Sequence, residues 1–101
     1  MPFQVYETES FLQVYESLDS LDRQWINKIK IQLVENPFSG KPLGYKWFRE
    51  KKLGDKRLYF MVSDEKQKVL LLAYGNKKKQ RKIIDHILWH KSDYLEMLRN
   101  I

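Results

Sequence analysis

The chain has 101 residues, and its composition is 43% hydrophobic, 14% aromatic and 32% charged. These values predict one folded domain over residues 1–101 with a single core, and they exclude a largely disordered chain. The net charge of +6 favours an anionic partner, and the absence of cysteine excludes disulfides and thiolate zinc sites. No apolar run reaches the roughly 18 residues of a membrane span and the first residues lack a signal-peptide pattern, so we expect a cytoplasmic protein without a membrane partner.

The first third of the chain has the spacing of helices. Apolar residues recur at helical intervals on both sides of a polar break, after a few residues that alternate between apolar and polar. These patterns predict a short strand at residues 3–6 and a helical hairpin over residues 11–35. We expect Asp19 or Ser20 to cap the second helix and Asn36-Pro37 to end it, with Asn36 in the left-handed conformation.

The middle of the chain has the pattern of an antiparallel sheet. After a loop at residues 38–44, alternating or continuously apolar runs predict three strands. In the second strand Leu58, Phe60 and Val62 share one face, which we expect to be the core face, and Arg57 lies on the opposite, open face. The third strand is apolar on both faces and should lie inside the sheet. The three strands span residues 45–51, 56–63 and 67–74.

The last quarter of the chain predicts a helix over residues 77–99. Its apolar stripe is discontinuous, which indicates a kink near Lys91-Ser92. The complete pattern predicts a small α/β (α+β) domain. In this domain a twisted antiparallel sheet packs against the N-terminal helical hairpin and the C-terminal helix.

Positive charge is concentrated in one segment. Residues 1–40 have a net charge of −3, residues 41–82 of +10 and residues 83–101 of −1. Such a field captures polyanions, and a merely solubilising surface is the equally weighted alternative. Neighbouring antiparallel strands lie about 5 Å apart, so we expect these cations to converge on one face and surround a phosphate. The candidate RNA-binding residues are Lys51, Lys52, Lys56, Lys78, Lys79, Arg81 and Lys82.

Aromatic and histidine side chains give weaker signals. Tyr45, Trp47 and Tyr59 lie among the cations and can stack on unpaired bases, although core packing is the favoured explanation for any single ring. His86 and His90 share a helical face without further ligands at suitable spacing, so we predict no metal site and treat His86 as a candidate proton donor. The sequence has no Gly-rich phosphate loop, His-Glu metal motif or nucleophile elbow.

Several short motifs follow one another over nearly the whole chain. In order they are Asn36-Pro37, Gly40-Lys41-x-Leu43, Tyr45-Lys46, Gly54-x-x-Arg57-Leu58, Asp64-Glu65-Lys66, an apolar strand and Gly75-x-Lys77. This order resembles the RelE/ParE superfamily of toxins from toxin–antitoxin systems, and is most similar to the RelE branch. The resemblance implies an endonuclease without metal or cofactor that cuts mRNA on the ribosome. It also implies a cognate antitoxin, which we expect to be acidic and to cover the basic face.

The resemblance assigns catalytic roles to four residues. Arg57 matches a strand arginine that stabilises charge at the scissile phosphate, and its removal from an open face should cost less than about 1 kcal/mol of stability. Lys46 matches a lysine assigned to proton abstraction or phosphate binding, and Lys77 lies in the basic group after the last core strand. Where some relatives have a second lysine this chain has Phe48, with Arg49 beside it as a substitute.

Other functions stay open at this stage. Relatives have a tyrosine on the terminal helix that this chain lacks, and His86 is the candidate for its role. RNA can be cleaved by attack of its own 2′-OH, so positioned cations are compatible with catalysis without a protein nucleophile. The alternatives are a non-catalytic or decayed module that binds RNA or the ribosome through the same face, and a ParE-like gyrase inhibitor.

Overall fold

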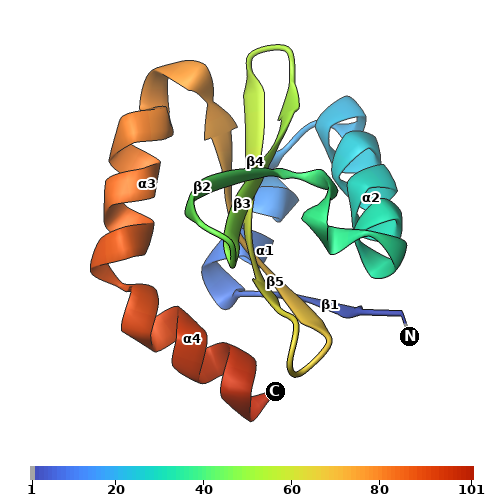
Figure 1. Ribbon diagram of the computed structural model, residues 1–101. Helices are drawn as coiled ribbons and strands as arrows, with labels where there is room; N and C mark the ends of the chain where they lie inside the picture. The colour runs from blue at the N-terminus through green and yellow to red at the C-terminus, as the bar shows by residue number, and fades with distance from the viewer. Residues whose placement is uncertain (1) are drawn as a thin grey trace.

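The computed structural model describes residues 2–101 as one sheet of five strands with helices on both of its faces (Figure 1). No helix in this range is long and apolar enough to cross a membrane. The strands are β1 (Gln4–Glu7), β2 (Lys41–Tyr45), β3 (Phe48–Leu53), β4 (Lys56–Ser63) and β5 (Lys68–Asn76). The helices are α1 (Glu9–Ser17), α2 (Ser20–Glu35), α3 (Gln80–Trp89) and α4 (Lys91–Asn100), with short 3-10 turns η1 (Pro37–Ser39) and η2 (Lys77–Lys79).

The N-terminal helical hairpin is confirmed. The side chain of Asp19 accepts a hydrogen bond from the backbone N–H of Asp22 at 2.9 Å, so Asp19 and not Ser20 caps α2. The expected left-handed Asn36 is wrong, because its φ is −144° and not positive. The helix ends there since Pro37 cannot continue it and begins η1 instead.

The strand order in the sheet is β1-β5-β4-β3-β2. β3 to β5 form the predicted antiparallel meander, and β2 adds to it antiparallel to β3. β1 pairs with β5 in parallel, so the sheet is mixed. β5 has a strand on each side, as its apolar faces predicted. The expected loop at 38–44 is wrong over most of its length. Despite Pro42 and Gly44, these residues form the edge strand β2, whose pairing with β3 is irregular between Pro42 and Tyr45.

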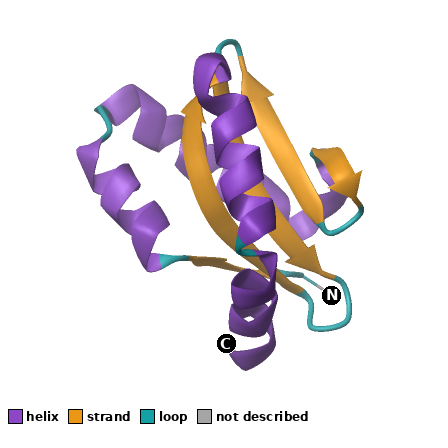
Figure 2. Cartoon of the chain, turned by 90° about the vertical axis from the view of Figure 1, so that its left-hand side faces the viewer, coloured by secondary structure: helices purple, strands orange, loops and turns teal. Residues whose placement is uncertain are grey.

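Both faces of the sheet are covered, so the expectation of one core face is wrong. Leu58, Phe60 and Val62 pack under α1 and α2 as expected. Tyr59 and Met61, on the opposite face of the same strand, form a second core with residues of α3 and α4. Figure 2 shows α3 crossing in front of the sheet with α4 continuing below it.

The C-terminal helix is interrupted at His90, which is one residue from the predicted kink. α3 ends at Trp89 and α4 begins at Lys91. His90 has φ −102° and ψ 18°, outside the helical region. The break redirects the chain, so that Ile87 of α3 and Leu98 of α4 enter the same core.

Candidate functional site

The β3–β4 turn and η2 meet at one end of the sheet. Lys56 pairs with Asn76, and the backbone N–H of Lys77 donates to the carbonyl of Asp55 at 2.8 Å. Figure 1 shows this hairpin tip beside the start of α3. We call the cationic residues gathered here the basic end. Its members are Lys52, Lys56, Arg57, Lys77, Lys78 and Lys79.

Three of these lysines project from η2. The side chain of Asn76 accepts a hydrogen bond from the backbone N–H of Lys79 at 3.2 Å, which caps this turn and leaves Lys77, Lys78 and Lys79 exposed. Arg81 follows in α3, where its Nε lies 3.8 Å from Asp85 Oδ2. Both side chains are exposed, so this ion pair contributes little to stability. The three exposed lysines make this turn a favourable position for an anion.

Arg57 belongs to the basic end but is buried, because α3 covers its face of the sheet. Its side chain is 5% exposed, and Nη1 donates to the carbonyls of Gly54 at 2.7 Å and Lys56 at 3.0 Å. Its Nε has no hydrogen-bond partner within residues 2–101. The expectation that Arg57 leaves the sheet on an open face is therefore wrong.

A buried polar cluster lies beside Arg57, and the sequence reasoning missed it. Glu50 is 1% exposed and pairs across the ladder with Tyr59, while Gln80 Nε2 at the start of α3 donates to Glu50 Oε2 at 2.8 Å. Burial, reinforced by the Glu50 carboxylate and opposed by the Arg57 guanidinium, raises the pKa of Tyr59 to about 12. The one available signal was the alternation of β3, which places Glu50 on the same inward face as Phe48.

Lys46 and Arg49 do not join the basic end. Arg49 pairs with Phe60, on the face under α2, and its guanidinium donates to three backbone carbonyls. The acceptors are those of Gly40 at 3.0 Å, Lys46 at 2.9 Å and Phe38 at 3.1 Å. Lys46 lies in the β2–β3 turn with Nζ 5.4 Å from the centre of the Phe38 ring. Both residues hold the β2–β3 hairpin against η1.

The expected convergence of all basic clusters on one face is thus wrong. Lys52 pairs with Arg57 and shares its face. Lys51 pairs with Leu58, and Lys56 Nζ lies 6.0 Å from the ring centre of Tyr74, so both project to the α2 face. The strand alternation separates neighbours in the sequence, and only the end of the sheet brings the two faces together.

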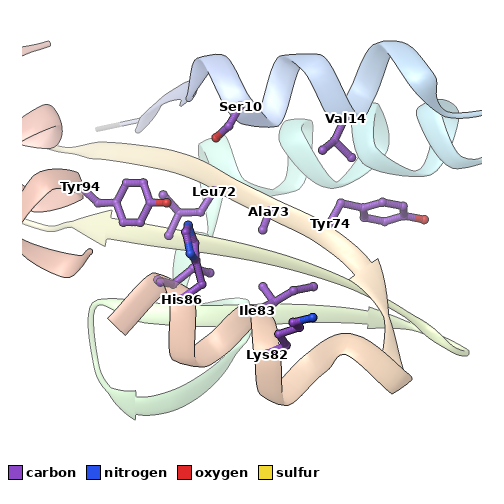
Figure 3. Close-up of a pocket in the computed structure, with 10 residues that line it drawn as sticks. Ser10, Val14, Leu72, Ala73, Tyr74, Lys82, Ile83, His86 and Tyr94 are labelled. Atoms are coloured by element: carbon purple, nitrogen blue, oxygen red, sulfur yellow. The ribbon is translucent and has the colours of Figure 1, made fainter. Parts of the chain in front are cut away.

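His86 faces a different region. A cavity of about 370 Å³ lies between α1, β5, α3 and α4 (Figure 3). His86 and Lys82 line it from α3, and Ser10 and Val14 from α1. The rings of His86 and His90 have centres 4.5 Å apart. Arg57 does not line this cavity, and no three His, Cys, Asp or Glu side chains of residues 2–101 come close enough together to hold a metal ion.

No family model and no curated protein sequence matches the chain, but solved structures do. A free E. coli RelE toxin variant is 23% identical with a TM-score of 0.70, over 86% of this chain and 99% of that one. The same variant in complex with a RelB antitoxin peptide is 26% identical, with a TM-score of 0.67, over 75% and 84%. The toxin–antitoxin complex RelBE2 from Mycobacterium tuberculosis matches at 21% identity and a TM-score of 0.66, over 76% and 93%. The chain has the fold of RelE toxins.

Proposed function

We propose that this chain, with its RelE-like toxin fold, is the toxin of a toxin–antitoxin pair and cleaves mRNA on the ribosome. The observation that carries the proposal is the basic end, where strand and helix elements bring Arg57, Lys52 and the η2 lysines together on this fold. The field of this segment suits a polyanionic substrate.

The chemistry needs no protein nucleophile. The 2′-oxygen of the RNA bonds to the adjacent phosphorus, the bond from phosphorus to the 5′-oxygen breaks, and one proton leaves the 2′-OH while another reaches the 5′-oxygen. The protein must orient the RNA and stabilise the charge that develops on the phosphate. We assign charge stabilisation to Arg57, phosphate binding to Lys77, and contacts with flanking phosphates to Lys52 and Lys78.

Arg57 is largely buried, so a local opening would widen the access of a phosphate to it. Its Nη1 is committed to two carbonyls, and its unpartnered Nε is buried under the start of α3. A small displacement of η2 and the first turn of α3 would admit a phosphate to Nε. Lys46 and Arg49 lie on the other face, so we assign them no part in the reaction.

The partner that we propose is an acidic antitoxin. A net charge of +10 over residues 41–82 favours a partner of opposite charge, and the structures similar to this chain include complexes of a toxin with its antitoxin. Its affinity should fall as the salt concentration rises through the physiological range.

One observation favours the alternative of a non-catalytic RNA- or ribosome-binding module. Glu50 puts a buried carboxylate on the same face as Arg57, where both act on Tyr59, and its charge opposes the approach of a phosphate. Gln80 donates a hydrogen bond to this carboxylate. Phe48 on the same strand carries no charge for the reaction. A protein with these residues retains the basic surface for binding with a weaker centre for catalysis.

Cleavage on programmed ribosomes tests the proposal. We expect the parent to cut mRNA, Lys77→Ala to lower the rate by roughly 10²–10³, and Lys78→Ala mainly to weaken binding and its salt dependence. Lys28→Ala, an exposed lysine of α2, is the matched control and should behave as the parent. A parent that binds ribosomes with these sensitivities but never cuts supports the alternative. A parent that neither binds nor cuts refutes both.

A further inference from the structure

Three aromatic rings form a graded stack at the β2–β3 turn. The rings of Tyr45 and Trp47 have centres 4.7 Å apart with an angle of 26° between their planes, and Trp47 and Phe48 follow at 6.1 Å and 24°. Phe48 is fully buried in the core under α3 and α4, Trp47 is half-buried, and Tyr45 is 41% exposed. The stack therefore rises from the core and ends at an accessible ring.

A cation already lies over the accessible ring. Lys91, the first residue of α4, has its Nζ 5.6 Å from the centre of the Tyr45 ring. Such a contact between exposed groups contributes only about 0.5–1 kcal/mol, so another π-surface can displace the ammonium group. The displaced ammonium group remains within reach of a phosphate attached to the incoming group.

The exposed ring lies on the same face of the sheet as Arg57 and Lys52 of the basic end. Tyr45 pairs with Phe48, and Phe48 lies in the same core as Tyr59, the neighbour of Arg57 on that face. From Phe48 to Lys52, the partner of Arg57, the strand rises by four residues, or about 13 Å. This distance corresponds to about four stacked nucleotides at roughly 3.4 Å each, and to fewer in an extended strand.

We propose that Tyr45, backed by Trp47 and flanked by Lys91, is a stacking subsite for one unpaired nucleobase of the RNA whose phosphate lies at the basic end. The inference rests on the proposed function, because it takes RNA as the ligand there. Ordinary packing accounts for Phe48 and the inner side of Trp47. It does not require an exposed tyrosine that continues the stack under a lysine, whereas sequence-tolerant binding of single strands uses this combination of aromatic ring and cation.

The test measures binding of labelled single-stranded oligonucleotides of two to ten nucleotides by fluorescence anisotropy at low salt. Tyr45→Leu should weaken binding by roughly 5- to 150-fold, and only for oligonucleotides long enough to reach the basic end. Tyr45→Phe and Tyr45→Trp keep a stacking ring and should bind as the parent or more tightly. Tyr45→Leu should weaken the binding of RNA and of DNA oligonucleotides alike, since the bases of both present a π-face.

The matched control is Tyr6→Leu. Tyr6 also has a lysine over its ring, with Lys68 Nζ at 6.0 Å, but it lies on β1 at the opposite edge of the sheet. Tyr6→Leu should therefore leave the affinity for oligonucleotides unchanged. Equal affinities of Tyr45→Leu, Tyr6→Leu and the parent would overturn the subsite. If Lys77→Ala lost binding in that same experiment, RNA binding at the basic end would stand without a subsite at Tyr45. If the parent binds no oligonucleotide, the subsite fails, and cleavage on ribosomes separately decides the proposed function.

Discussion

Replacing Arg57 by alanine should destabilise the fold as well as remove a charge from the basic end. Nη1 makes two hydrogen bonds to backbone carbonyls from a side chain that is 5% exposed. A hydrogen bond from a charged group contributes about 1.5–3 kcal/mol, and we count the two as one because they share a nitrogen. Loss of packing beneath α3 adds to this value, so we expect a total of about 2–4 kcal/mol. This range replaces the value below 1 kcal/mol that an open face implied.

Urea unfolding at neutral pH measures the stability, and cleavage on programmed ribosomes measures the activity in the same preparations. Arg57→Met retains much of the apolar length without charge, whereas Arg57→Lys keeps the charge without the guanidinium geometry. We expect both to be more stable than Arg57→Ala, and only Arg57→Lys to retain part of the activity. An Arg57→Ala protein with the parent's midpoint and slope would refute the structural role. Parental cleavage by Arg57→Ala would refute the catalytic one.

Three further substitutions test the packing on the two faces of the sheet. The native fold raises the pKa of Tyr59 from 10.0 to about 12, so it favours the protonated hydroxyl. The contribution of this hydroxyl to the free energy of unfolding is fully present below pH 10 and is lost as the pH rises towards 12. Tyr59→Phe should remove that part of the alkaline loss, about 1–1.5 kcal/mol by pH 11, which urea unfolding from pH 7 to 11 measures. It should cost little at pH 7, because the hydroxyl has no hydrogen-bond partner among the described residues. Gly40→Ala should destabilise by about 1–3 kcal/mol in thermal unfolding, since the new Cβ would lie 2.7 Å from the Glu50 carbonyl oxygen and 2.8 Å from the Phe60 ring; a parental Tm would contradict this packing. Arg49→Ala should cost about 2–4 kcal/mol in urea without changing oligonucleotide affinity, and reduced affinity with an intact fold would contradict its purely structural role.

Local patterns predicted the elements whose residues carry their own signal. The helical hairpin, β4, β5 and the break near Lys91 all follow from spacing, because helical and strand periodicities are properties of contiguous residues. The edge strand β2 carries no such signal. Its Pro and Gly suit a loop, and pairing with β3 alone makes it a strand.

The candidate site, like the fold, has features that the sequence predicts and features that only the tertiary structure shows. The sequence by itself determined that one segment carries the positive charge and that Arg57 begins a central strand. Tertiary structure decided which cations lie together, because alternation along a strand sends neighbours to opposite faces and only the pairing register shows which residues share a face. It put Arg49 under α2, buried Arg57 beneath α3 and joined Glu50 to Gln80 across 30 residues of chain. Contacts over such separations depend on how two layers pack against a sheet, and no local pattern records that packing.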